Sequence, residues 1–214
     1  MLNLNSKYAF LIQEIINQLS PDLLLPEFKK DWTPQNPTQG FCSVASEALF
    51  FMIGGSANGW KAQNGRDNQG IVHWWLMHEE FGRLDPTADQ YFLNNQTPPY
   101  LKARSGGFQG IRQEIGNAWG FDRKPSARAQ KLLDKIIEHR WKLWIAFQKN
   151  DDANQKDSPY WWNKEGLNHK DAQNWLIEKS SPLLLKKYKN HLRLDEEFNT
   201  QKIHKKYTKK IKHK

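Results

Sequence analysis

The feature of this sequence that most constrains its fold is a short run of β-branched and aromatic residues, IVHWWLM, at positions 71–77. Its length and composition predict a buried strand. A second short strand is expected at 83–85, ended by Pro86, because the intervening HEEFG segment has a suitable length for a hairpin connection. The chain is therefore expected to contain a small antiparallel sheet.

Helical patterns lie on both sides of this expected sheet. Residues 6–19 place apolar side chains at helical spacing, and FCSVASEALFFMIGG after Gly40 is an apolar helix pattern that stops at Gly54-Gly55. Further helices are expected at 125–149, 169–180 and 182–193. The sequence therefore predicts an α+β fold followed by a helical C-terminal region.

Three segments carry no sustained helical or strand period. Residues 26–40 hold three prolines and predict a constrained loop, and the polar, glycine-rich residues 56–70 predict another. Residues 92–124 contain Pro98-Pro99 and Gly106-Gly107, so they are interpreted as a long loop or lid.

Composition excludes several classes of protein. A single cysteine cannot form an intramolecular disulfide, which argues against a disulfide-stapled scaffold. Ten Trp, six Tyr and eleven Phe residues can fill a core, and no apolar run reaches the ~18–20 residues that a membrane span needs. The first 25 residues lack the pattern of a signal peptide. A cytoplasmic protein without membrane contact is therefore expected.

The positive charge is concentrated at the C-terminus. From Lys186 to Lys214, eleven Lys and Arg residues stand against three acidic residues, so this segment carries +8 of the net charge of +9. Interleaved Lys and Tyr residues could follow a phosphate backbone, and a solvated terminus accounts for the same composition equally well. The candidate nucleic-acid contacts are Lys205, Lys206, Lys209 and Lys210.

The residues that point to chemistry are Cys42, His73 and Asp85. Cys42 is expected at the start of a helix, where the positive end of the helix dipole and free N–H groups favour a thiolate. If 78–80 form the hairpin turn, residue 77 pairs with 81, so His73 and Asp85 are directly opposed and point to the same face. Asp85 could then orient His73 while the imidazole faces Cys42, as thiol acyl transfer requires.

Each of these three residues also fits a role without catalysis. Cys42 and His73 could be core side chains, and Asp85 before Pro86 could initiate a turn. Together with His78, they could also bind zinc, but no CxxC, HxH or HExxH spacing supports a metal. Nucleotide-binding glycine motifs are missing from the sequence, so no cofactor is expected.

The runs N-P-T-x-G-x-C, I-G-G, H-W-W and D-P-T-A-D-Q-Y, within residues 30–92, resemble the YunG-like family of small proteins. Similar segments are also expected in phage proteins. The H-x-W…L-D-P-T pattern resembles the core of papain-like and transglutaminase-like enzymes, in which a helix packs with a small antiparallel sheet. This resemblance implies that Cys42 is the nucleophile, His73 the base and Asp85 the orienting residue.

Papain-like enzymes also place an oxyanion-supporting side chain before the cysteine. Asn36 stands six residues before Cys42, the offset at which those enzymes carry a glutamine, although Asn36 before Pro37 also suits a simple turn. Gln39 and Gln35 are rival candidates. Gln90, five residues after Asp85, could close the site or only pack against it.

Two tryptophans of the expected strand are candidate substrate contacts. Trp74 and Trp75 must point to opposite faces of a strand, so at least one of them belongs to the core. Trp161 and Trp162, further along the chain, are expected to pack against the 125–149 helix.

The expected organisation is a papain/transglutaminase-like catalytic core with a lid at 1–124, a helical extension at 125–193 and a basic tail at 194–214. The favoured function is a cysteine-dependent hydrolase or acyltransferase that acts on an amide or ester-like carbonyl through a thioester. The substrate could be a protein, a peptide or a small molecule. The alternative is a non-catalytic module that binds nucleic acid or protein through its helical region and tail.

Overall fold

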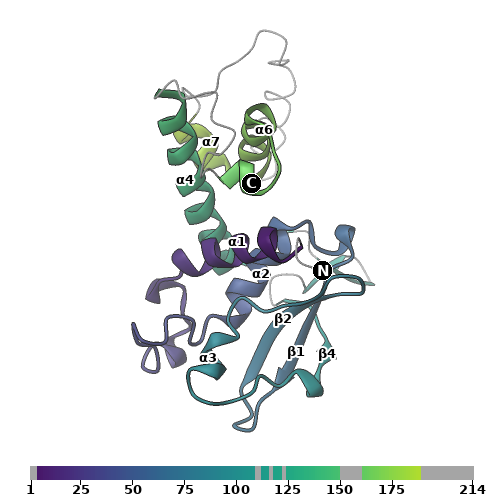
Figure 1. Cartoon of the computed structure of the whole chain (residues 1–214). Coiled ribbons are helices and arrows are strands. Elements are labelled where there is room, and N and C mark those ends of the chain that lie inside the picture. Colours follow the sequence, from purple (N-terminus) through teal and green to yellow (C-terminus); the bar gives the residue numbers. More distant parts are fainter. Residues whose placement is uncertain (1–3, 109–111, 116–117, 122–123, 150–160, 189–214) are drawn as a thin grey trace. The chain divides into compact units, whose positions relative to one another are not determined.

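The computed structural model describes residues 4–108, 112–115, 118–121, 124–149 and 161–188 (Figure 1). The chain forms two compact units, Met1–Ile136 and Ile137–Lys214, whose boundary falls inside helix α4 (Ala127–Lys149). The fold is α+β, with a small antiparallel four-stranded sheet in the first unit. In the described part of the chain, no helix has the length and apolar character needed to span a membrane.

The sheet is built around one apolar strand. It contains β1 (Lys61–Arg66), β2 (Val72–His78), β3 (Gly82–Leu84) and β4 (Arg104–Ser105), in the order β3-β2-β1-β4 (Figure 1). The predicted strand at 71–77 corresponds to β2. The predicted strand at 83–85 corresponds to β3 with both ends shifted by one residue. Strand β2 therefore has a neighbour on each side.

Strand β1 corrects the prediction of a loop at 56–70. Its residues KAQNGR are polar, yet they pair with β2 along their whole length, from Lys61 opposite Met77 to Arg66 opposite Val72. One polar side chain has a specific role, because Oε1 of the Gln63 side chain accepts a hydrogen bond from the Trp75 indole N–H at 3.0 Å. Pairing with an apolar partner strand outweighs the weak strand propensity of these residues.

The hairpin register also differs from the prediction. Met77 pairs with Arg83, not with residue 81, and the turn consists of residues 79–81. The side chain of His78 shapes this turn, since its Nδ1 accepts from the backbone N–H groups of Glu80 and Phe81. His78 therefore ends β2, whereas the sequence predicts it within the turn.

Four helices belong wholly or in part to the first unit. Helix α1 covers Leu4–Asn17, α2 covers Cys42–Met52 and α3 covers Asp89–Phe92, and α4 begins at Ala127. Short 3₁₀ helices lie at Pro21–Leu23, Pro26–Phe28, Gly55–Asn58 and Tyr100–Lys102. Helix α2 ends where Gly54 adopts a left-handed conformation, with φ of 85°. The core that these elements share includes Leu11, Ile15, Phe41, Val44, Leu49 and Leu76.

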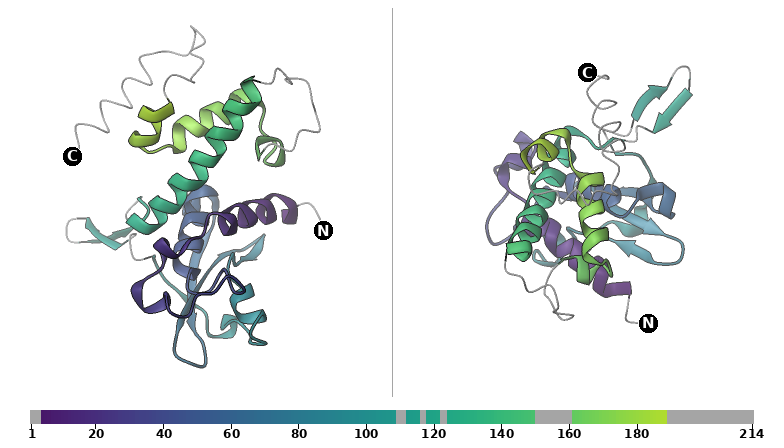
Figure 2. Two further views of the ribbon diagram at one scale, coloured as in Figure 1. Left: turned by 90° about the vertical axis from the view of Figure 1, so that its left-hand side faces the viewer. Right: turned by 90° about the horizontal axis from the view of Figure 1, so that it is seen from above.

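The segment 92–124 is not a structureless lid in its described parts. It contributes β4 to the main sheet, and β5 (Arg112–Ile115) pairs with β6 (Ala118–Phe121) in a separate two-stranded sheet (Figure 2). Gly106, directly after β4, lies so close to β1 and β2 that a side chain would not fit. A Cβ atom there would collide with the Asn64 side chain and lie 3.3 Å from the Trp74 ring. The sequence does not reveal strands β4, β5 and β6, because they are too short to show the alternation of apolar and polar residues by which a strand is recognised.

The second unit is helical. It contains the end of α4, α5 (Trp161–Lys164), α6 (His169–Lys179) and α7 (Pro182–Tyr188). Its core is aromatic, since Trp141, Trp144, Trp161 and Trp162 are all buried. Trp162 packs against Phe147 of α4 with ring centroids 5.3 Å apart, as the sequence predicts. The tail at 194–214, with Lys205, Lys206, Lys209 and Lys210, lies outside the described residues.

Candidate functional site

Cys42 is the first residue of helix α2. Phe41 precedes it and offers no side-chain cap. In the described part of the structure, nothing accepts a hydrogen bond from the backbone N–H of Cys42 or of Ser43. The half-buried thiol lies 3.6 Å from the carbonyl oxygen of Val72, at the start of β2. An uncapped helix N-terminus thus holds a thiol and free N–H donors close together.

His73 and Asp85 form a buried pair beside this thiol. The Nε2 atom of His73 lies 2.6 Å from Oδ2 of Asp85, and their side chains are 1% and 4% exposed. By the register of β2 and β3, residue 85 falls opposite Trp75, so Asp85 is a diagonal neighbour of His73. A shift of two residues keeps a side chain on the same face, and the two groups therefore meet.

Asp85 is held by further donors on two residues, Tyr100 and Thr87. Its Oδ2 atom accepts from the Tyr100 hydroxyl at 2.8 Å, and its Oδ1 atom accepts from the Thr87 backbone N–H at 3.0 Å. Tyr100 in turn lies under the Arg83 guanidinium, whose central carbon is 3.4 Å from the ring centroid. The carboxylate is therefore fixed toward the imidazole by groups on three segments.

Gln90 occupies the other side of the imidazole. Its Nε2 atom lies 3.2 Å from His73 Nδ1 and donates to the Thr87 carbonyl oxygen at 2.9 Å. Its Oε1 atom accepts from the backbone N–H of Gly40 at 3.4 Å. Because Thr87 O can only accept and Gly40 N–H can only donate, the amide orientation is assigned by its network. Neutral His73 then carries its proton on Nε2 and accepts at Nδ1.

The protonation of His73 is governed by opposing effects. Burial lowers the pKa of His73, whereas hydrogen bonds and charge interactions with Asp85 and Cys42 raise it, and the net result is a pKa of about 9. The rings of Tyr91 and Trp75 enclose the imidazole, with centroids 4.8 Å and 5.8 Å away. At neutral pH the arrangement therefore favours an imidazolium next to Cys42.

Cys42 opens onto a cavity of about 1090 Å³ in the first unit. His73 is not on its wall, so the imidazole reaches the cavity only through Cys42. The wall combines apolar, amide and charged side chains. Among its members are Phe28, Gln39, Cys42, Glu47, Asn64, Arg66, Val72, Trp74, Gln90, Tyr91, Arg104, Phe108 and Arg128.

The structure distinguishes the candidate oxyanion-supporting residues. Gln39 lines the cavity with Cys42, whereas Asn36 and Gln35 do not. The Asn36 amide instead donates to Gln39 Oε1 at 3.1 Å, which turns the Gln39 NH₂ group away from Asn36. Of these three candidates, Gln39 alone therefore shares the cavity wall with Cys42, and Asn36 holds its side-chain oxygen.

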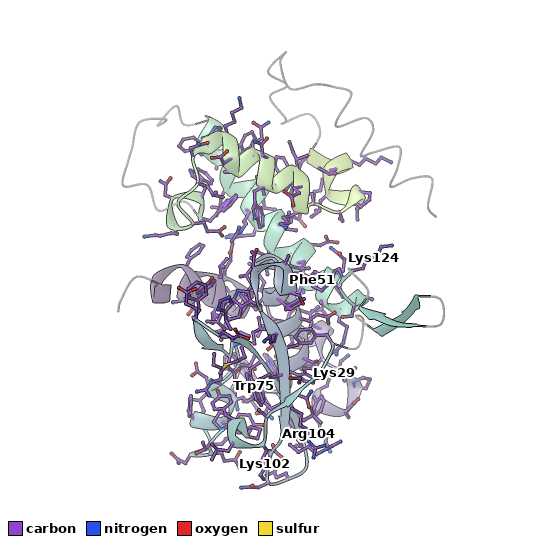
Figure 3. The ribbon with its side chains drawn as sticks, turned by 90° about the vertical axis from the view of Figure 1, so that its right-hand side faces the viewer. Lys29, Phe51, Trp75, Lys102, Arg104 and Lys124 are labelled. Carbon is purple, nitrogen blue, oxygen red and sulfur yellow. The ribbon has the colours of Figure 1, made fainter. Side chains whose placement is uncertain are left out.

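The two tryptophans of β2 separate as strand geometry requires. Trp74 lines the cavity and packs against Phe108 with ring centroids 5.1 Å apart. Trp75, labelled in Figure 3, is 1% exposed and packs against Tyr100. Trp75 is thus a core residue that cannot contact substrate in the cavity, and the expected substrate contact applies to Trp74 alone.

Sequence reasoning did not identify Tyr91, Tyr100 or Thr87 as parts of this site. Tyr91 and Thr87 belong to the D-P-T-A-D-Q-Y run, so proximity to Asp85 was the available signal. Tyr100 stands alone in the segment interpreted as a lid, where no pattern marked it. Within the described residues, no group of three His, Cys, Asp or Glu side chains is arranged to hold a metal ion.

Comparison with known proteins gave no match to a family model, to a curated protein or to a solved structure. The resemblance of residues 30–92 to the YunG-like family therefore stays a prediction.

Proposed function

We propose that the first unit is a cysteine-dependent hydrolase or acyltransferase with a papain/transglutaminase-like core. One observation carries the proposal: His73 bonds Asp85 through one ring nitrogen while the pKa of the imidazole is raised by Cys42 as well. A nucleophile, a base and an orienting group are the elements of covalent acyl transfer. Cys42 also faces a cavity large enough for an organic substrate.

The proposed reaction uses these groups in turn. His73 Nδ1 takes the thiol proton of Cys42, and Sγ attacks the carbonyl carbon of the substrate. The carbonyl oxygen becomes an oxyanion, for which the free N–H groups at the start of α2 and the Gln39 amide are available donors. The intermediate collapses, His73 returns the proton to the leaving amine or alcohol, and a thioester on Cys42 remains.

The second half of the reaction uses the same base. His73 removes a proton from water or from an incoming amine, which attacks the thioester and releases Cys42 as a thiol after reprotonation. Water gives hydrolysis, and an amine gives acyl transfer. Gln90 responds to the protonation state of His73, because its NH₂ group can bond Nδ1 only when the imidazole is neutral. In the proposed cycle, protonation of Nδ1 breaks this bond and turns Nδ1 into a donor toward Cys42.

The protein's single cysteine makes a direct test possible. We expect p-nitrophenyl acetate to acetylate Cys42, with a burst of p-nitrophenol and an acetyl adduct detected by mass spectrometry. The Cys42→Ala variant should show neither, and Cys42→Ser keeps the shape of the site as a matched control. Adding a primary amine should release an N-acetyl amine if the enzyme is a transferase, whereas acetate alone indicates a hydrolase.

Alkylation supplies an independent measure. Folded protein should react with iodoacetamide at pH 7 at least about tenfold faster than the same chain unfolded in urea, because the imidazolium and the helix N-terminus stabilise the thiolate. Equal rates in the folded and unfolded protein, together with an intact burst in Cys42→Ala, would overturn the proposal.

A further inference from the structure

Two arginines share the face of the sheet that lines the cavity. Asn64 of β1 pairs with Trp74 on one side and with Arg104 on the other, so these residues form one row across β4, β1 and β2. Arg66 follows Asn64 by two positions and pairs with Val72 in the next row. All five residues line the cavity. Strand alternation therefore places Arg66 and Arg104 on one face as diagonal neighbours.

This pair lies close to the thiol. Cys42 Sγ contacts the carbonyl oxygen of Val72, and Val72 is the direct cross-strand partner of Arg66. Paired residues on neighbouring strands have Cβ atoms about 4.5–5.5 Å apart. Arg66 is therefore one strand away from the residue that Cys42 touches, within the reach of a single substrate molecule.

In the described part of the chain, no carboxylate forms an ion pair with either of the two guanidinium groups. One nitrogen of Arg66 donates to the Gly70 carbonyl oxygen at 2.6 Å, and among the described residues the Arg104 side chain has no hydrogen-bond or ion-pair partner. The buried carboxylate on the wall, Glu47, is already held by the Ser126 backbone N–H at 2.7 Å and hydroxyl at 2.6 Å. Like charges on neighbouring strands repel, and a bound anion removes that repulsion.

We infer that the substrate of Cys42 carries a carboxylate or phosphate group that binds between Arg66 and Arg104. The inference rests on the proposed function, and it names the chemical class that this site selects. Guanidinium groups match such anions because each offers two parallel N–H donors. Asn64 is the cross-strand partner of Arg104 and stands two positions before Arg66 on β1, so it adds an amide to the wall next to both arginines.

The test uses pairs of alkylating probes that differ only in charge. The iodoacetyl derivative of glutamate amide is compared with that of glutamine amide, and the derivative of O-phosphoserine amide is compared with that of serine amide. Each probe delivers the same reactive carbon to Cys42, the protein's single thiol. The two pairs separate a preference for carboxylate from a preference for phosphate.

We expect the favoured anionic probe to alkylate Cys42 about tenfold faster than its neutral partner at low salt, with saturation at high probe concentration. Arg66→Gln, Arg104→Gln and the double variant should each reduce this ratio, and the double variant should bring it close to one. The rate with plain iodoacetamide is measured for every variant as well, because it reports the reactivity of Cys42 itself and separates that reactivity from the charge preference.

Lys102→Gln is the matched control. Lys102 lies close to Arg104 along the chain (Figure 3), bonds the Asn68 side chain at 3.3 Å and is not part of the cavity wall, so its removal should leave the ratio unchanged. Fast iodoacetamide alkylation without any charge preference overturns the anion site and leaves the proposed function intact. An equal loss of preference in Lys102→Gln also overturns it, because general surface charge then explains the effect.

Discussion

Among the described residues, each unit of this protein contains a buried ion pair, and the two pairs differ in their surroundings. In the first unit, His73 and Asp85 lie beside Cys42 and behind the wall of a cavity. In the second unit, Arg140 is fully buried, bonds Glu165 and lies over the rings of Trp161 and Trp175, 4.2 Å and 4.4 Å from their centroids.

The difference lies in what each pair can do. The Arg140 guanidinium stays protonated at any pH that proteins tolerate, and aromatic rings enclose it, so the second pair holds helices together. The His73 imidazole can gain and lose a proton, and it lies close enough to Cys42 for the thiol to raise its pKa. Burial of a charged pair therefore does not by itself point to chemistry, and the proposed function rests on a titratable member that lies next to a thiol.

The largest effect is expected from Asp85→Asn in the first unit. The amide cannot stabilise the imidazolium, so acyl transfer to Cys42 should fall about a thousandfold, within the range of general-base contributions. The p-nitrophenyl acetate burst rate measures this loss. Asp89→Asn, on the nearby α3, is the matched control, since no contact joins Asp89 to His73 in the described structure. A loss below threefold in Asp85→Asn contradicts the assigned role.

In the second unit, removal of one charge should affect stability and leave the chemistry unchanged. Arg140→Met leaves Glu165 buried without its partner, which should cost about 3–5 kcal/mol of unfolding free energy. Tryptophan fluorescence in urea measures this change. The double variant with Glu165→Met should recover most of the loss, because an apolar pair of similar volume is often as stable. The folded variants should keep the iodoacetamide rate of Cys42, and a matching fall in that rate would remove the contrast between the two pairs.

The pH dependence of stability should separate the two pairs further. The pKa of His73 is raised from 6.5 to about 9 in the folded protein, so protonation stabilises the fold fully below about pH 6.5 and this contribution is lost as pH rises through 9. The contribution is on the order of 3 kcal/mol, and His73→Gln should remove it together with the slope between pH 7 and 9. Urea unfolding at several pH values tests this. Arg140→Met should keep the slope.

The sequence allowed the contact between His73 and Asp85 to be predicted although the predicted register was wrong. The true pairing differs from the predicted one by two residues, so residue 85 falls opposite residue 75 and not opposite 73. Side chains alternate between the two faces of a strand, so a shift of two residues leaves Asp85 on the same face of the sheet as His73. The register itself depends on His78, whose ring accepts from two turn N–H groups, and side-chain bonds of this kind leave no periodic pattern. The helix start at Cys42 was predicted because the proline-rich loop ends at Gly40 and an apolar helix pattern begins directly after it.

The rest of the site comes from segments without a readable pattern. Strand β1 is polar, so it becomes a strand only through pairing with β2, and Arg66 and Asn64 gain their positions from that pairing. Tyr100 and Arg104 belong to the segment interpreted as a lid, where a two-residue strand is too short to show alternation. Long-range pairing decides these positions, and local sequence does not encode it.

The smallest effect is expected from Tyr100→Phe, which sharpens the description of the first pair. The change removes the hydroxyl that donates to Asp85 Oδ2 at 2.8 Å and keeps the ring that packs on Trp75 and Arg83. A hydrogen bond to a charged group contributes about 1.5–3 kcal/mol, and here Asp85 retains Thr87 and His73 as donors, so about a fivefold fall in the burst rate is expected. A purely structural role would lower stability without moving the pH profile. A positioning role should shift the pH at which the burst rate is half-maximal, because in Tyr100→Phe the Oδ2 atom of Asp85 interacts with His73 without a competing donor. An unchanged pH profile together with an unchanged burst rate would show that Tyr100 does not position Asp85.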